Sequence, residues 1–149
     1  MSYCEDERAA EVAEIARQLP NLTGQLGRLI WRHAKGALPR GMANVLAALG
    51  DGPETVGRLA ERQGIAQPTL TRMVERLESD GLVRRERHPT DGRAVVVSLT
   101  PHGERELTEL RGRYLAVLAE RLDSLSDQEL RALTDATESL AHLIEVLRD

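Results

Sequence analysis

The sequence lacks the short motifs that many nucleotide-binding and hydrolytic enzymes carry. No G-x-x-x-x-G-K-[ST], G-x-G-x-x-G or G-x-S-x-G pattern occurs. The four histidines are scattered, without metal-ligand spacing to one another or to the single cysteine, Cys4. Most carboxylates lie beside arginines in helical patterns, as they do on solvated surfaces. We therefore predict that the protein is not an enzyme and that it uses no metal and no cofactor.

Cysteine and long apolar runs are also scarce. One cysteine cannot form an intrachain disulfide framework. No run of eighteen apolar residues predicts a transmembrane helix, and the acidic N-terminus, MSYCEDERAA, lacks the apolar segment of a signal peptide. A length of 149 residues suffices for one domain with a core and an added dimerising layer. We therefore expect a cytoplasmic protein.

The net charge of −4 hides an uneven distribution. Residues 28–99 contain twelve Lys and Arg against eight Asp and Glu, a local balance of +4. Residues 1–27 have a balance of −3, with two basic and five acidic side chains, and residues 100–149 one of −5, with six and eleven. Because the local field steers a polyanion, the basic middle of the chain is compatible with nucleic-acid binding.

Residues 56–81 predict two short amphipathic helices that cross steeply. Each helix has an apolar face at i, i+3 and i+4 spacing, formed by Val56, Leu59 and Ala60 in the first and by Leu70, Met73, Val74 and Leu77 in the second. Only about four residues separate the helices, as in a helix-turn-helix. Gly64 can take the positive φ that ends the first helix, and Pro68 suits the first turn of the second.

The second helix, residues 66–79, is the candidate recognition helix. Its polar side chains lie off the apolar stripe and can bind base edges or phosphates in a major groove. They are Gln67, Thr69, Thr71, Arg72 and Arg76. The alternative from this stretch alone is a helical hairpin with a solvated polar face.

A β-hairpin is predicted at residues 82–99. Two strand-like runs, 82–87 and 94–99, flank the turn cluster at 88–92. A helix-turn-helix followed by such a hairpin is a winged helix, so we predict a mainly α (α+β) fold. The hairpin arginines can reach phosphates or a minor groove, and those on the strands can alternatively brace the wing. These are Arg84, Arg85, Arg87 and Arg93.

This segment resembles the DNA-binding core of the multiple-antibiotic-resistance regulator (MarR) family. Asp91-Gly92-Arg93 matches the D-x-R wing signature of that family, and Leu99, Thr100 and Gly103 match its L-T-x-x-G pattern. The resemblance covers roughly residues 55–105. It implies that Arg93 enters the minor groove at the wing tip, while Asp91 braces Arg93 or a neighbouring arginine. Thr69, Thr71 and Arg72 would lie on the recognition helix.

Helical patterns with apolar seams flank the winged helix. Residues 5–19 and 21–35 read as one kinked helix or two abutting helices, because Pro20 interrupts the pattern. A short helix is expected at 40–49. Thr100 caps a long helix, and Ser126 with Glu129 forms a capping box that begins another.

The leucine seams of the two C-terminal helices exceed what a small winged helix can cover, so they predict a dimer interface. We assign residues 1–36 and 100–149 to dimerisation and 37–99 to DNA binding. The alternative is an intramolecular helical hairpin without a partner. A two-fold dimer would place two recognition helices about one DNA turn apart.

Two further sites follow from the resemblance. Many relatives bind small aromatic acids beside the first helix, where Arg28, Trp31 and His33 are the candidate lining for an aromatic or phenolic effector. The alternative for Trp31 is core or interface packing. The peroxide-sensing branch uses a cysteine on its first helix, which makes Cys4 a candidate redox thiol. The neighbouring carboxylates would raise the pKa of Cys4, so the alternative is an incidental exposed thiol.

We therefore predict a homodimeric, sequence-specific DNA-binding regulator that acts as a repressor on a pseudo-palindromic operator in double-stranded DNA. It would read the operator through residues 66–79 and 82–99, and a small ligand would release it. The alternatives are a winged-helix protein-interaction module without DNA binding, or a thiol-based redox regulator that uses Cys4.

Overall fold

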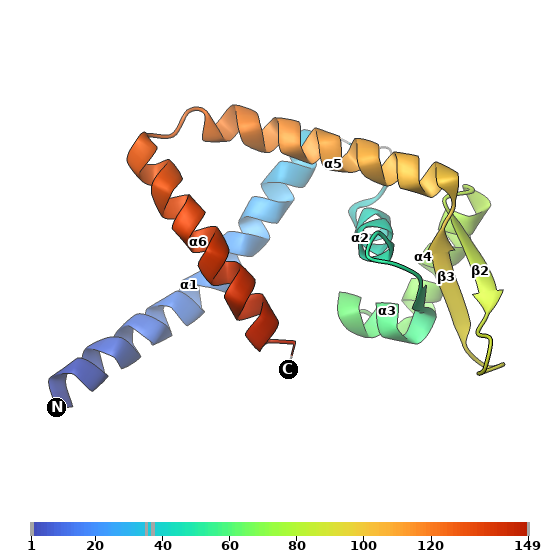
Figure 1. The fold of residues 1–149 in the computed structure, drawn as a ribbon, viewed down its shortest axis with the longest axis horizontal. Helices are drawn as coiled ribbons and strands as arrows, with labels where there is room; N and C mark the ends of the chain where they lie inside the picture. Colours follow the sequence, from blue (N-terminus) through green and yellow to red (C-terminus); the bar gives the residue numbers. More distant parts are fainter. Residues whose placement is uncertain (1, 35, 37, 149) are drawn as a thin grey trace. The chain divides into compact units, whose positions relative to one another are not determined.

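The computed structural model describes residues 2–34, 36 and 38–148, with the side chains of residues 2–5 outside this description. The chain falls into two compact units, residues 1–114 and 115–149. The elements, in chain order (Figure 1), are α1 (Ser2–Ala34), α2 (Arg40–Leu49), β1 (Glu54–Thr55), α3 (Val56–Gln63), α4 (Gln67–Ser79), β2 (Val83–Arg87), β3 (Val95–Leu99), α5 (Pro101–Leu122) and α6 (Asp127–Val146). This order confirms the predicted mainly helical, winged helix-turn-helix fold.

The core of the first unit is aliphatic and belongs to the winged helix. The predicted apolar faces of α3 and α4 are buried in it, apart from the half-buried Met73, together with one face of α2 and with Val83 and Val97 of the wing strands. Its fully buried larger side chains are Val45, Leu46, Leu59, Leu70, Val74, Leu77, Val83 and Val97. The buried side chains of α4 pack into this core and fix the position of the helix. The opposite side of α4 therefore faces solvent.

The sheet is antiparallel with strand order β1-β3-β2. β2 and β3 pair from Val83 with Leu99 to Arg87 with Val95, as the predicted hairpin requires. β1 was not predicted. It pairs Glu54 with Val97 and has only two residues, too few to show an alternating pattern.

The two predicted N-terminal segments form one continuous helix, α1, with Pro20 inside it. Proline has no N–H to donate to the carbonyl of Ala16. The Thr23 hydroxyl donates to the carbonyl oxygens of Leu19 at 2.8 Å and Pro20 at 3.2 Å. Since Ala16 and Pro20 are both exposed, water can satisfy the carbonyl that Pro20 leaves without a partner.

The base of the wing is joined to the start of α5 by what we call the wing–α5 junction, residues 81, 82, 100 and 103. The Thr100 N–H donates to the Leu82 carbonyl at 3.0 Å, and the Thr100 hydroxyl donates to the Gly81 carbonyl at 2.6 Å. The same hydroxyl accepts from the Gly103 N–H at 3.0 Å, which confirms the predicted N-cap. A β-carbon at Gly103 would lie 1.9 Å from the Leu82 carbonyl oxygen. Thr100 and Gly103 of the L-T-x-x-G pattern thus hold α5 against the wing.

The second unit contains the end of α5 and all of α6. Ser126 begins α6 with the predicted capping box: its N–H donates to Glu129 at 2.8 Å, and its hydroxyl accepts from the Glu129 N–H at 3.3 Å. Within residues 115–148 no side chain is buried. Large apolar side chains of α6 are exposed instead, among them Leu133 and Ile144 at 44% and 50%. Among the helices described, none combines the length and apolarity that crossing a membrane requires.

Candidate nucleic-acid interface

The turn between α3 and α4 forms as the sequence predicts. Gly64 has φ of 62°, and the Ile65 N–H donates to the Ala60 carbonyl at 3.1 Å. This left-handed residue ends α3 and lets α4 begin three residues later. Thr55 caps the start of α3, because its hydroxyl accepts from the Arg58 N–H at 3.4 Å.

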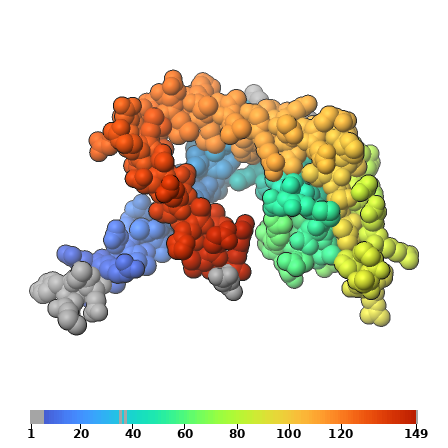
Figure 2. All heavy atoms as spheres, viewed as in Figure 1, coloured from blue at the N-terminus to red at the C-terminus, as the bar shows by residue number. Residues whose placement is uncertain are grey.

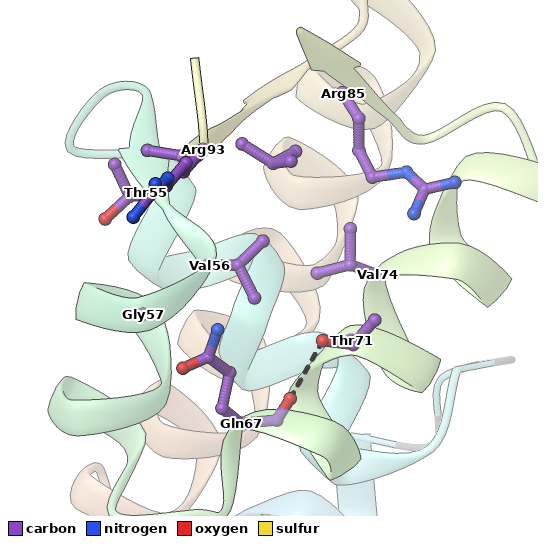
Figure 3. Close-up of a pocket in the computed structure, with 10 residues that line it drawn as sticks. Thr55, Val56, Gly57, Gln67, Thr71, Val74, Arg85 and Arg93 are labelled. Atoms are coloured by element: carbon purple, nitrogen blue, oxygen red, sulfur yellow. Dashed lines mark hydrogen bonds between the residues drawn. The ribbon is translucent and has the colours of Figure 1, made fainter. Parts of the chain in front are cut away.

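The outer side of α4 presents the predicted polar residues. Gln67, Thr69, Arg72 and Arg76 are exposed, while Thr71 is half-buried. The Thr71 hydroxyl donates to the Gln67 carbonyl at 2.9 Å, which leaves its oxygen free only to accept (Figure 3). The N-terminal half of α4 therefore offers an amide, two hydroxyls and one guanidinium to a ligand outside the helix.

The two arginines of α4 differ in their electrostatic partners. Arg76 forms an ion pair with Asp80 at 3.1 Å. No carboxylate among the residues that the structure describes lies within 4.0 Å of the Arg72 guanidinium. Arg72 can therefore bind an outside acceptor without first breaking an ion pair.

Arg85 braces the wing against α4. Its guanidinium lies 2.7 Å from the Glu78 carboxylate and 3.7 Å from that of Glu75. The backbone N–H of Arg85 also donates to the Glu78 carboxylate, at 3.2 Å. Of the two roles considered for the hairpin arginines, phosphate contact and bracing, this geometry favours bracing for Arg85. The sequence did not indicate Glu75 or Glu78 as partners of Arg85, because no local pattern connects a helix side chain with a side chain on the following strand.

Arg84 and Arg87 differ from Arg85. Arg84 lies on the other face of the sheet, where it donates to Ser98 at 3.0 Å and pairs with Glu86 at 3.4 Å. Arg87 is exposed at the outer end of β2. Of the three arginines of β2, Arg87 is thus placed most freely for a phosphate.

The Glu78–Arg85 pair makes the attachment of the wing sensitive to acid. Hydrogen bonding to Arg85 lowers the pKa of Glu78 below its usual 4.5. A carboxylate with a depressed folded-state pKa adds stability above its unfolded value, and this is lost as the pH falls through the folded value. We predict that Glu78→Gln flattens the loss of stability below about pH 4.5. Urea denaturation at pH 3 to 6 measures this, with Glu61→Gln, an exposed glutamate of α3, as control. Equal pH profiles for wild type and Glu78→Gln would contradict it.

The wing tip is held by two side chains acting on the backbone. The Asp91 carboxylate accepts from the Arg93 N–H at 3.1 Å, so Asp91 positions the main chain of Arg93. The His88 Nδ1 accepts from the N–H groups of Thr90 at 3.3 Å and Asp91 at 3.2 Å. The sequence placed His88 in a turn cluster but did not indicate that its Nδ1 accepts hydrogen bonds from the turn backbone. Its place at the start of a Pro-Thr-Asp-Gly turn was the available signal. In Figure 2 this end of the hairpin projects from the rest of the winged helix.

A cleft of about 300 Å³ lies between the start of α3, the N-terminal half of α4 and the wing (Figure 3). It brings together residues from both halves of the predicted DNA surface. The predicted residues that line it are Gln67, Thr71, Arg85 and Arg93. Val56 and Gly57, at the start of α3, line the cleft across from these residues of α4 and the wing. The arrangement offers guanidinium, amide and hydroxyl groups along one continuous surface, as a phosphate backbone and base edges require.

The three candidate effector residues do not converge. Trp31 packs on the small cluster of Ala43, Leu107 and Leu110, and its ring centroid lies 6.1 Å from that of Tyr114. Burial there raises the pKa of Tyr114. Arg28 lines a separate hollow on α1, and His33 is exposed. The side chain of Cys4 lies outside the described residues, and no group of three or more potential metal ligands occurs among the side chains described.

Comparison with known proteins gives one consistent family. The MarR family model matches residues 38–94. An uncharacterised HTH-type transcriptional regulator of Mycobacterium leprae is 31% identical over 135 residues, which cover 89% of this chain and 94% of that regulator. A MarR family protein from Bacillus stearothermophilus is 28% identical, with a TM-score of 0.69 and coverage of 94% and 97%. The PcaV transcriptional regulator from Streptomyces coelicolor, solved with its natural ligand, is 26% identical, with a TM-score of 0.61 and coverage of 83% and 89%.

The family is one of transcriptional regulators and not of enzymes, and its members bind DNA and form dimers. Sequence similarity extends over most of the chain, and the fold contains the helix-turn-helix and wing that such regulators use. This chain belongs to the MarR family of transcriptional regulators.

Proposed function

We propose that the protein is a homodimeric repressor that occupies a pseudo-palindromic operator through α4 and the wing. The observation that carries this proposal is the continuous surface of Gln67, Thr71 and Arg93 next to Arg72, which has no ion pair with any carboxylate that the structure describes. Major-groove reading falls to Gln67, Thr69, Thr71 and Arg72. Arg93 enters the flanking minor groove, with its backbone fixed by Asp91.

The other arginines have supporting roles in this proposal. Arg76 and Arg87 are exposed and contact phosphates, and Arg76 exchanges Asp80 for the DNA backbone. Arg84 and Arg85 hold the wing through Ser98 and Glu78. Phosphate contacts set the register on the duplex, while base contacts supply the sequence preference.

Residues 1–36 and 100–149 form the dimerisation region in this proposal, and residues 37–99 the DNA-binding region. The support is apolar surface on α1 and α6. Leu22 and Leu26 of α1 are each 55% exposed, and α6 buries none of its described side chains. Large apolar patches on a soluble protein favour association, and a second copy offers the same surfaces in two-fold symmetry.

The dimer can be tested on α1. We expect the double change Leu22→Asp and Leu26→Asp to weaken self-association at least about 100-fold, since two leucines leave the interface and two charges enter it. Sedimentation equilibrium measures this. Asn21→Asp with Thr23→Asp adds the same charge beside that face and should leave the dimer intact. A monomeric wild type at micromolar concentration would overturn the proposal.

The wing can be tested with Arg93→Ala. We expect operator affinity to fall by about tenfold or more, because a charged contact in the minor groove is lost. Fluorescence anisotropy on DNA from upstream of the gene measures this, with an unchanged dimer as control. Unchanged affinity would remove the wing tip from the interface.

The same assay separates DNA reading from the rival protein-interaction module. Wild-type affinity should fall steeply with salt, with a log–log slope of about −0.9 for each phosphate neutralised. A winged helix that binds only protein would show no duplex binding at low salt.

Release by a small aromatic or phenolic effector completes the proposal. Its support is the complex of PcaV with its natural ligand and the paired rings of Trp31 and Tyr114, whereas Arg28 lies in a separate hollow on α1. Loss of operator binding on addition of an aromatic acid is the measurement. If none of a panel of such acids lowers the affinity, the effector is removed from the proposal and the operator-binding surface is unaffected.

A further inference from the structure

A second cleft, which we call the rear cleft, lies on the winged helix away from the surface assigned to DNA. Its volume is about 430 Å³. It is bounded by the turn after α2, the face of the sheet that holds Arg84 and Ser98, and the first half of α5. Arg84 and Ser98 are cross-strand partners on the face opposite Arg85, which contacts α4. The rear cleft therefore shares no lining residue with the cleft between α3, α4 and the wing.

The floor of the rear cleft is aliphatic. Leu49 and Leu107 are buried at its base, and Leu99 and Pro53 complete it. The turn after α2 leaves free space beside the cleft. Nothing lies within 4 Å of the position of a β-carbon at Gly52, whose φ of 137° disfavours a side chain. Polar groups supply more of the exposed lining than these side chains do, so the apolar surface is small and suits only a short hydrocarbon chain.

Charged side chains line the rim of the rear cleft. Arg111 lies against the turn, where a β-carbon at Gly50 would be 2.7 Å from its Nη2. Among the described residues, no carboxylate lies within 4.0 Å of Arg111 and no cation within 4.0 Å of Glu104. Arg84 is held by Ser98 and Glu86. The rim thus has one guanidinium without an ion pair and one carboxylate that repels a second negative charge.

We propose that the rear cleft binds a small aliphatic monocarboxylate. The carboxylate pairs with the Arg111 guanidinium, whose planar fork matches it with two N–H donors. The hydrocarbon chain lies on Leu49, Leu99 and Leu107. Glu104, seven residues before Arg111 and therefore on the same side of α5, disfavours dicarboxylates and phosphate esters. This site is independent of operator binding and of the aromatic site considered on α1.

Titration of the full-length, DNA-free protein with hexanoate, followed by amide NMR shifts, tests the proposal. Saturable shifts are expected at Gly50, Gly52 and Ser98, with a Kd of about 1 mM or tighter for a ligand of this size. Hexanamide, which keeps the chain and loses the charge, should bind about tenfold more weakly. Arg111→Gln should lose the same factor for hexanoate, while Arg105→Gln, another exposed arginine of α5, should bind as the wild type does.

Three outcomes would overturn the proposal. They are the absence of saturable shifts up to about 10 mM hexanoate, equal affinity for hexanoate and hexanamide, and shifts confined to residues 25–32 of α1. A fourth outcome, unchanged hexanoate binding by Arg111→Gln, would exclude Arg111 as the carboxylate partner and would also overturn the proposal. Because no DNA is present, failure here leaves the operator-binding proposal untouched, and failure of operator binding leaves the rear cleft untouched.

Discussion

Replacement of Gly103 by alanine is expected to lower the free energy of unfolding by about 3 kcal/mol or more, a large effect for one methyl group. The added β-carbon would lie 1.9 Å from the Leu82 carbonyl oxygen and 2.9 Å from its carbonyl carbon. Both are backbone atoms, so no side chain can rotate away. The same carbonyl oxygen accepts from the Thr100 N–H, and α5 cannot retreat from the wing without breaking that hydrogen bond.

Chemical denaturation measures this change, and α5 supplies its control. Gly112 lies on the same helix, with nothing within 4 Å of the position of a β-carbon. Gly112→Ala should stabilise the protein by about 0.5–1 kcal/mol, because alanine loses less backbone entropy in a helix. Equal stability of the Gly103→Ala and Gly112→Ala variants would show that the close approach of α5 to Leu82 is not required.

Arg72→Ala is expected to relax sequence preference. The Arg72 guanidinium is exposed and has no ion pair with a described carboxylate, so it can make a bidentate contact with guanine at no cost in broken contacts. Loss of that contact should reduce discrimination at one operator position by about 1–3 kcal/mol. Competition between operator fragments that differ at single base pairs measures this.

Arg76→Ala is the matched control for Arg72→Ala, since Arg76 lies one turn later on α4 and is paired with Asp80. Its removal should weaken binding to all duplexes alike. The log–log slope of affinity against salt should become shallower by about 0.9, the contribution of one phosphate contact. If Arg72→Ala behaves in the same way, Arg72 is a phosphate contact and base reading falls to Gln67, Thr69 and Thr71.

The winged helix was predictable because its signals are local. Gly64, the apolar stripe of α4 and the turn at residues 88–92 each specify structure within a few residues. The contacts that position the site were not predictable, because they join side chains and backbone of different elements and follow no local sequence pattern. Glu78 on α4 reaches Arg85 on β2, and Gly103 on α5 reaches Leu82. The L-T-x-x-G pattern was visible in the sequence. Only the structure shows why a glycine is needed there, because it places the Leu82 carbonyl against Gly103.

The candidate effector residues show that closeness in sequence does not predict a shared site. Arg28, Trp31 and His33 are close in sequence, yet residues two apart on a helix point in different directions. Trp31 therefore packs against Tyr114 while His33 remains in solvent. Tyr114 lies 83 positions after Trp31, and no local pattern connects the two rings.

The absence of buried side chains within residues 115–148 has a consequence for the amount of regulator in a cell. A helical segment without its own core opens readily and offers sites to proteases. Pairing with a second copy would close those sites, so degradation would slow as synthesis rises. Subunits made at very low rates would then be removed before they meet, which sets a threshold of expression below which no functional regulator accumulates.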